Sequence, residues 1–370
     1  MLDRIDKGSG GVEDPCARLE YGRFSGRMCI KKAHRTLAAS ATLSLFLFAA
    51  AQNVQAAGEI VRDVVFEEYS ERSSSAELSR RMFSPFTREQ LERQIARTGK
   101  KMIEQSVKLS EEKFIVYVPS PTPARGFAVL IFVPPWQDAR LPPGWAAVLD
   151  RYGIIFVSAA RSGNDESVFD RREPLALLAV HNIVRRYPVD PQRVYISGFS
   201  GGARVALRLA LAYPDIFRGA ILNAGSDVIG DSKIPIPPKD LFLQFQSTHL
   251  VYVTGEGDTL QLNDDLASMR SLKKWCVFDV QSHIERSASH EVAGSTALAW
   301  ALGNLLHDAP PDPKSLTTCR LAIEKELNLK MQEVESLIAA GQDDEAQRML
   351  VKIDEHYGGL AAPRTVELAH

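Results

Sequence analysis

Short apolar runs alternate with amphipathic segments through the middle of the chain. Residues 127–133 and 154–158 are continuous apolar runs, a pattern typical of strands buried on both faces of a parallel sheet. Residues 175–186 instead carry apolar positions at helical spacing. We expect further strands at 114–118, 194–197, 220–223, 250–254 and 276–280, and further helices at 145–151, 203–213, 262–273 and 295–306. This order predicts an α/β fold with a mostly parallel, doubly wound sheet.

The segments on either side of this region have a different pattern. Residues 58–104 are charged and lack a long apolar run, and a capping box at Thr87 predicts a helix from 87 to 103. Near the C-terminus, apolar positions at helical spacing predict an α-helical hairpin turned at Gly341. Its two helices span 316–340 and 343–357. Such a hairpin cannot bury its own apolar face, so we expect it to dock on the rest of the chain or on a protein partner.

The first 57 residues have the pattern of an export signal. Basic residues precede an apolar run at 37–51, which is shorter than the roughly 20 residues that a membrane span needs. We predict cleavage after Ala56, a secreted or periplasmic protein, and no stable membrane span in the mature form; a permanent anchor is the alternative. Polar residues before Met28 make that methionine an alternative start. The predicted division is 1–57 signal region, 58–110 lead-in, 111–308 α/β domain, 309–314 linker and 315–370 helical hairpin and tail.

Composition narrows the class of protein. The chain has 370 residues, 24% of them charged, and a formal net charge of −2, without a basic stripe of the kind that binds nucleic acid. Of its four cysteines, Cys276 and Cys319 lie beyond the predicted cleavage site. They either pair as a disulfide in an oxidising compartment or remain two small buried side chains. Their spacing does not suggest a zinc site, and we predict no metal.

A Gly-Phe-Ser-Gly-Gly motif at 198–202 is the centre of the predicted chemistry. It follows the strand at 194–197 and opens the helix at 203–213, so Ser200 lies on a sharp strand-to-helix turn. This is the context of a nucleophile elbow, in which the flanking glycines allow a strained backbone and the serine hydroxyl is exposed. We therefore predict that Ser200 is a catalytic nucleophile.

A serine nucleophile needs a histidine base and a carboxylate that orients it. Catalytic side chains in such sheets follow the carboxyl ends of strands, and only His283 and His290 follow the last expected strand. We favour His290, which lies in a loop of small residues, over His283. For the acid we favour Asp258, directly after the strand at 250–254, over Asp227. The weaker acidic candidates are Glu256, Asp264 and Asp265.

An oxyanion hole needs two backbone N–H groups that point at the developing charge. Gly201, directly after the serine, is the first expected donor. The second is expected in the loop after residue 133, which begins with Pro134 and Pro135. Since proline has no N–H, the sequence leaves Trp136 or Gln137 as the second donor.

Three sites in the sequence resemble those of a known family. Gly-Phe-Ser-Gly-Gly at 198–202, Gly-Glu-Gly-Asp at 255–258 and Ser-His at 289–290 are similar to the signature sites of secreted bacterial α/β-hydrolases of the polyhydroxybutyrate-depolymerase and feruloyl-esterase type. The resemblance spans about 114–306. It implies the α/β-hydrolase fold and hydrolysis of a small or polymeric ester through an acyl-serine, without metal or organic cofactor. One departure is that Pro134-Pro135 replaces the family's His-Gly pair.

Two other functions stay open at this stage. A serine peptidase of the same fold would use the same three residues with a different pocket. A non-catalytic binding protein would keep the fold and use the C-terminal helices as its functional surface.

Overall fold

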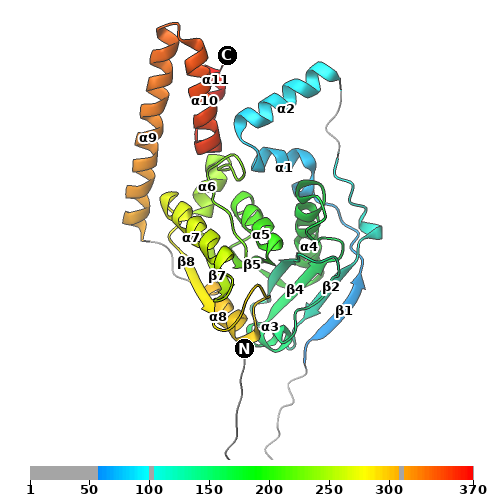
Figure 1. Ribbon diagram of the computed structural model, residues 1–370. Helices are drawn as coiled ribbons and strands as arrows, with labels where there is room; N and C mark the ends of the chain where they lie inside the picture. The colour runs from blue at the N-terminus through cyan, green and yellow to red at the C-terminus, as the bar shows by residue number, and fades with distance from the viewer. Residues whose placement is uncertain (1–56, 100–103, 308–311, 370) are drawn as a thin grey trace, which may run out of the picture. The chain divides into compact units, whose positions relative to one another are not determined.

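An eight-stranded mixed sheet forms the centre of the protein. The computed structural model describes residues 57–99, 104–307 and 312–369, and orders the strands β1-β2-β4-β3-β5-β6-β7-β8 (Figure 1). Strands β3 to β8 are parallel, whereas β2 is antiparallel to both β1 and β4. The strands are β1 (Glu59–Val64), β2 (Phe114–Val118), β3 (Phe127–Val133), β4 (Ile154–Ala159), β5 (Val189–Phe199), β6 (Gly219–Asn223), β7 (His249–Gly255) and β8 (Val280–Glu285).

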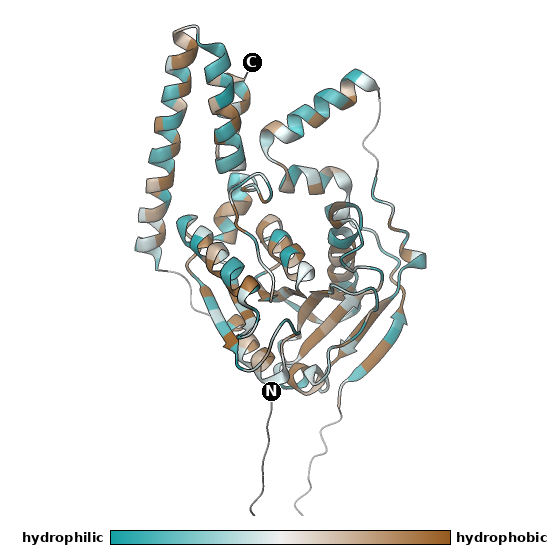
Figure 2. Ribbon diagram, viewed as in Figure 1, coloured by the Kyte–Doolittle hydropathy of each residue, from teal (hydrophilic) through white to brown (hydrophobic). Residues whose placement is uncertain are grey.

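Helices cover both faces of this sheet. Alternate strand residues face opposite sides, so Val116 packs with the side of α4 and α5 and Tyr117 with the side of α3 and α8. Strand β3 is buried at every position, as a central strand covered on both faces should be, and Figure 2 shows the central strands in apolar colours. The helices are α1 (Ser75–Met82), α2 (Pro85–Thr98), α3 (Trp145–Tyr152), α4 (Glu173–Arg186), α5 (Gly201–Ala212), α6 (Lys239–Phe245), α7 (Thr259–Lys274), α8 (Ser295–Leu305), α9 (Pro313–Ala339), α10 (Asp343–Tyr357) and α11 (Arg364–Leu368).

The predicted doubly wound α/β sheet and the C-terminal helical hairpin are confirmed, in the α/β-hydrolase arrangement. The short helices α1, α6 and α11 were not expected, and three further elements differ from expectation. The charged lead-in contributes strand β1, an exposed edge strand that apolar periodicity does not reveal. Helix α2 begins at Pro85 with Ser84 as its N-cap, two residues before the expected Thr87. The last strand is 280–285, not 276–280, so His283 lies within β8 and does not follow it.

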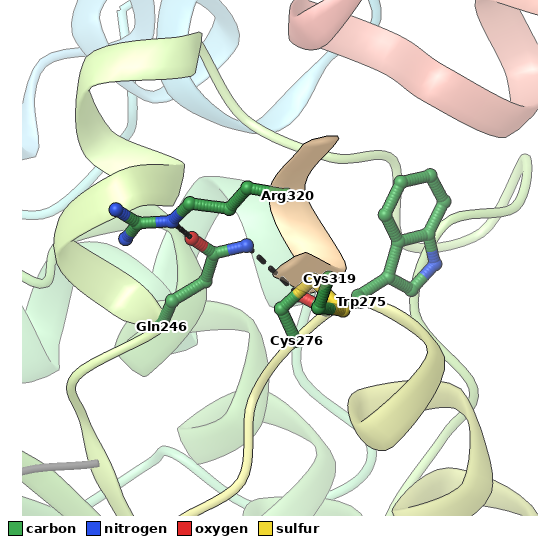
Figure 3. The surroundings of a disulfide bond; sticks show 5 residues. All are labelled: Gln246, Trp275, Cys276, Cys319 and Arg320. Carbon is green, nitrogen blue, oxygen red and sulfur yellow. Dashed lines mark hydrogen bonds between the residues drawn. A yellow bond between two sulfur atoms is a disulfide. The ribbon is translucent and has the colours of Figure 1, made fainter. Parts of the chain in front are cut away.

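A disulfide attaches the C-terminal hairpin to the α/β domain. Cys276, just after α7, is bonded to Cys319 in α9, with their Cα atoms 5.8 Å apart (Figure 3). Beside it, the Arg320 guanidinium donates to the Gln246 side chain at 2.6 Å, and that amide donates to the Trp275 carbonyl at 3.0 Å. Of the two options for these cysteines, a disulfide or two unpaired buried side chains, the structure contains the disulfide.

The C-terminal end of α10 contacts the lead-in. The buried carboxylate of Asp354 in α10 accepts hydrogen bonds from the Ser84 hydroxyl and from the Phe86 backbone N–H at the start of α2. Docking within the chain is therefore the option that the structure shows for this hairpin. Helix α9, the first of the hairpin, begins at Pro313, inside the segment expected to be a linker.

The predicted export signal and its cleavage site lie outside the described residues, as do 308–311 of the expected linker. Within the described ranges, no helix combines the length and apolarity needed to cross a membrane.

Candidate active site

Ser200 lies on the tight turn between β5 and α5. Its backbone has φ 55° and ψ −123°, in the region that non-glycine residues rarely adopt, and its N–H donates to the Asn223 carbonyl at 2.9 Å. A Cβ on Gly202 would lie 1.9 Å from the Val133 carbonyl oxygen, and a Cβ on Gly198 would lie 2.3 Å from the Gly202 carbonyl carbon. The two glycines are therefore required by close backbone approach as well as by the turn itself.

The serine hydroxyl meets the two residues that the sequence favoured as base and acid. His290 Nε2 is 2.9 Å from Ser200 Oγ, and His290 Nδ1 is 2.5 Å from Asp258 Oδ2. The Asp258 side chain is 9% exposed, whereas the His290 side chain is 44% exposed. An acid shielded from water thus holds one nitrogen of an imidazole whose side chain is partly exposed to solvent.

Backbone contacts fix the loops that carry Asp258 and His290. The Glu256 N–H donates to the Glu285 carbonyl, and the Gly257 N–H donates to the Ala288 carbonyl, both at 2.9 Å. A Cβ on Gly255 would lie 2.2 Å from the Ser289 carbonyl oxygen. The glycines around Asp258 therefore let its loop lie directly against the histidine loop.

The rival candidates have other partners. Arg204 bonds to both Asp227 and Asp264, the latter at 3.0 Å. Asp265 is buried and accepts hydrogen bonds from the Ser226 and Thr254 hydroxyls, both at 2.6 Å, and burial raises the pKa of its carboxyl. The His283 ring stacks on Trp300, with centroids 4.8 Å apart.

Glu256 also lies in this loop and accepts a hydrogen bond from the Ser287 N–H at 3.4 Å. His290 and Asp258 are thus the pair that the structure brings to Ser200 in place of these rivals.

The loop after β3 lies against the first turn of α5, where the predicted oxyanion donors are. Among the described residues, the N–H groups of Trp136, Gln137 and Gly201 have no hydrogen-bond acceptor. Carbonyls of the same loop are held instead: the Asn164 N–H donates to Pro135 at 3.0 Å, and the Arg161 N–H donates to Gln137 at 2.7 Å. The loop is fixed through its oxygens, which leaves its N–H groups available.

Arg172, a residue that the sequence analysis missed, supports this loop from below. Its guanidinium is buried, with Nη2 donating to the Pro134 carbonyl at 3.0 Å and Nε donating to the Ser162 carbonyl at 2.9 Å. Desolvation lowers the pKa of Arg172 to about 10, although the negative charges of Glu173 and Glu166 oppose the shift. Nothing in its sequence position, within a charged stretch before α4, distinguishes it from a surface arginine.

Two asparagines were also missed. The Asn223 side chain, at the end of β6, donates to the Val253 carbonyl at 2.8 Å and accepts from the Ala293 N–H at 2.7 Å, which ties β7 to the histidine loop. The Asn164 amide lies over Gly201, where a Cβ would be 2.3 Å from its Oδ1. Both residues follow strands at the carboxyl edge of the sheet, so the rule that selected His290 could have found them.

This arrangement can support nucleophilic chemistry at an acyl carbon. A hydroxyl, an imidazole and a shielded carboxylate form one hydrogen-bonded series beside free backbone N–H groups, which is the set of parts that acyl transfer needs. Among the residues that the structure describes, no group of three His, Cys, Asp or Glu side chains could hold a metal ion.

Comparisons with known proteins identify relatives of part of this chain. A poly(3-hydroxyalkanoate) depolymerase C of Paucimonas lemoignei is 28% identical over 124 residues, covering 30% of this chain and 30% of the depolymerase. An acetylxylan esterase of Coprinopsis cinerea is 32% identical over 104 residues, covering 28% of this chain and 24% of the esterase. The chain is a distant homologue of these ester hydrolases. The matched stretch spans less than a third of either relative, and no protein-family model matches the sequence.

Solved structures that are similar to this chain include hydrolases. A ferulic acid esterase has a TM-score of 0.37 at 16% identity and covers 52% of this chain and 89% of its own. A fluorophosphonate-binding serine hydrolase of Staphylococcus aureus has a TM-score of 0.43 at 13% identity and covers 68% of this chain and 100% of its own.

Proposed function

We propose that this protein is a serine hydrolase that cleaves a carboxylic ester through an acyl-serine intermediate. The observation that carries the proposal is the hydrogen-bonded series from Asp258 through His290 to the Ser200 hydroxyl. The distant homology to depolymerases and an esterase supports an ester as the bond that is cleaved. The names of those relatives give a polyester and an acetylated polysaccharide as substrates, and the proposal covers a small or a polymeric ester.

The proposed reaction has two halves. Ser200 Oγ attacks the ester carbonyl carbon while His290 Nε2 takes the hydroxyl proton, and Asp258 stabilises the resulting imidazolium. The N–H of Gly201 and that of Trp136 or Gln137 stabilise the oxyanion. The tetrahedral intermediate expels the alkoxide, which takes the proton from His290. A water molecule, deprotonated by His290, then attacks the acyl-serine, and His290 returns the proton to Ser200 Oγ as the carboxylic acid leaves.

Loss of Ser200 tests this mechanism directly. Ser200→Ala should reduce hydrolysis of a short 4-nitrophenyl ester to background, because no other group in the series can form the acyl intermediate. Ser197→Ala is the matched control, since Ser197 is buried in β5, the strand that leads to Ser200, and has no bond to Asp258 or His290. Near-normal turnover by the Ser200→Ala protein would exclude the acyl-serine route.

A paired histidine comparison tests the assignment of the base. His290→Ala should lose activity, and His283→Ala should retain it, because His283 packs on Trp300 within β8. Labelling of the wild-type protein by a fluorophosphonate probe, located at Ser200 by peptide mass spectrometry, provides an activity-independent readout of the nucleophile. Inactivity of His283→Ala alone would assign the base to the other residue.

We further propose that the protein is exported. The basic and apolar pattern of the first 57 residues supports this, and the Cys276–Cys319 disulfide suits an oxidising compartment. Sequencing the N-terminus of the mature protein tests it: a terminus at Ala57 is expected, and an uncleaved cytoplasmic protein with two free thiols would contradict it.

A further inference from the structure

Aromatic side chains form a continuous row that begins at the candidate base. The Phe199 ring lies 4.9 Å from the His290 ring, and the Trp136 ring lies 6.1 Å from the Phe199 ring, centroid to centroid. The Arg140 guanidinium covers the Trp136 ring at 4.0 Å. Loop residues after β3 therefore place an exposed cation at one end of an aromatic row whose other end lies beside His290; Phe199 is 8% exposed and Trp136 is half-buried, so the row offers the edges of its rings to a ligand.

The cation at the end of this row lacks a counter-charge within the chain. Among the described residues, no carboxylate lies within ion-pairing distance of Arg140, although Asp138 is exposed in the same loop. By comparison, Arg161, Arg171 and Arg204 near the same edge of the sheet all pair with acids. Stacking on indole orients the Arg140 guanidinium and leaves its N–H groups free to bind an anion.

We propose that the row of Phe199, Trp136 and Arg140 is a substrate subsite, and that it selects esters whose apolar chain or ring ends in an anionic group. The ester carbonyl lies at Ser200, the apolar part lies along Phe199 and Trp136, and the terminal carboxylate pairs with Arg140. Half-esters of dicarboxylic acids are the simplest compounds with this chemistry. The inference rests on the proposed ester hydrolysis and adds the substrate class to it.

The test compares two 4-nitrophenyl esters that differ only in terminal charge: mono-4-nitrophenyl suberate and its methyl-capped diester. The wild-type protein should favour the anionic ester by about three- to fivefold in kcat/KM, the range expected for one solvent-exposed ion pair, and added NaCl should reduce this preference. Arg140→Gln should bring the ratio of the two kcat/KM values close to one. Hydrolysis of the neutral diester reports the proposed function separately from the charge preference.

Arg151→Gln is the matched control variant. Arg151 also lies over an aromatic ring, that of Tyr152 at 5.6 Å, but in the last turn of α3, just before β4 begins, and thus at the opposite end of the strands from Ser200. This variant should retain the wild-type ratio. An unchanged ratio in Arg140→Gln, or an equal fall in Arg151→Gln, would overturn the subsite.

A binding measurement keeps the inference testable even if neither ester is hydrolysed. Isothermal titration should detect binding of 4-phenylbutyrate to the wild-type protein, several-fold weaker binding to Arg140→Gln, and weaker binding of the uncharged 4-phenylbutyramide. Equal affinity of the acid and the amide, or no binding of either, would contradict the subsite independently of catalysis.

Discussion

At the scale of single residues, the loop beside Ser200 is held by groups that do not themselves react. Pro134 and Pro135 cannot donate hydrogen bonds, so this loop is fixed by donors to its carbonyls, chiefly the buried Arg172. Arg172 also holds Ser162, two residues before the asparagine that lies over Gly201. One side chain thus positions both segments that border the proposed oxyanion site.

Replacing Arg172 should therefore affect turnover more than substrate binding. Arg172→Met is expected to lower kcat about tenfold with little change in KM, because an N–H displaced by a fraction of an ångström stabilises the oxyanion less well. Steady-state kinetics with a neutral ester measures this split. Arg172→Lys should recover part of the loss, because an ammonium can reach one of the two carbonyls.

Arg208→Met is the control for stability alone. Arg208 bonds to the buried Glu173, next to Arg172 in sequence, but does not contact the oxyanion loop. Both methionine variants should lower the midpoint of thermal unfolding, since both disturb buried charge. A fall in kcat of the same size in both would mean that Arg172 has no specific positioning role.

At the scale of secondary structure, the sequence predicts the central elements well and the peripheral ones poorly. The runs that became β3 and β4 are buried on both faces, so their apolar residues are continuous and easy to recognise. Strand β1 is an exposed edge strand, stabilised by pairing with β2 and lacking an apolar pattern of its own. Helix α6 contains seven residues within a proline-rich insert, too few for a helical period to be clear.

In the candidate site, residues with a recognisable local context were easier to predict than a residue that acts through long-range contacts. Ser200, Asp258 and His290 could be predicted because each lies in a recognisable context: an elbow motif, a glycine turn after a strand, and a loop before a helix. Arg172 acts through long-range contacts with backbone carbonyls, and no local pattern marks that role. Its function depends on which loops the fold brings together.

The disulfide is an element-scale connection between α7 and α9, and its removal should be costly. It closes a loop with a sequence separation of 43, for which the chain-entropy account gives a stabilisation of about 4 kcal/mol. We expect the double variant Cys276→Ser, Cys319→Ser to lower the free energy of unfolding by about 2–4 kcal/mol, measured by urea denaturation.

Activity of this variant separates the hairpin from the catalytic machinery. The disulfide lies beside Gln246 and Trp275 (Figure 3). Neither its cysteines nor these two neighbours bond to Ser200, so the folded variant should retain its kcat. Reduction of the wild-type protein should reproduce the loss of stability. Unchanged stability after reduction would show that the other contacts of the hairpin hold it without the bond.

At the scale of the whole molecule, the lead-in and the C-terminal helices are joined by hydrogen bonds. Asp354 in α10 accepts hydrogen bonds from Ser84 and Phe86 at the start of α2. Burial raises the pKa of the Asp354 carboxyl above its ordinary value of 3.8, although these hydrogen bonds oppose the shift. The folded protein therefore holds this proton more tightly than the unfolded chain does.

This shift predicts the sign of a pH effect on stability. As pH rises from about 4 through the raised pKa, the folded state loses the advantage of its tighter proton binding, so the Asp354 contribution to stability falls. The side chain of the Asp354→Asn variant cannot ionise, so its contribution to stability does not fall as pH rises. Urea denaturation from pH 4 to 7 should show the variant gaining stability relative to wild type as pH rises; a relative loss would contradict the assigned direction.

The contact between Ser84 and Asp354 also bears on the order in which the protein can be completed. These residues are 270 positions apart in sequence, so α2 acquires its partner only after almost the whole chain has been synthesised. A chain that ends before α10, through a premature stop or a proteolytic cut, keeps Ser200, Asp258 and His290. It lacks the carboxylate that accepts hydrogen bonds at the start of α2. Loss of α10 would therefore act directly on the start of α2, although the two helices lie near opposite ends of the sequence.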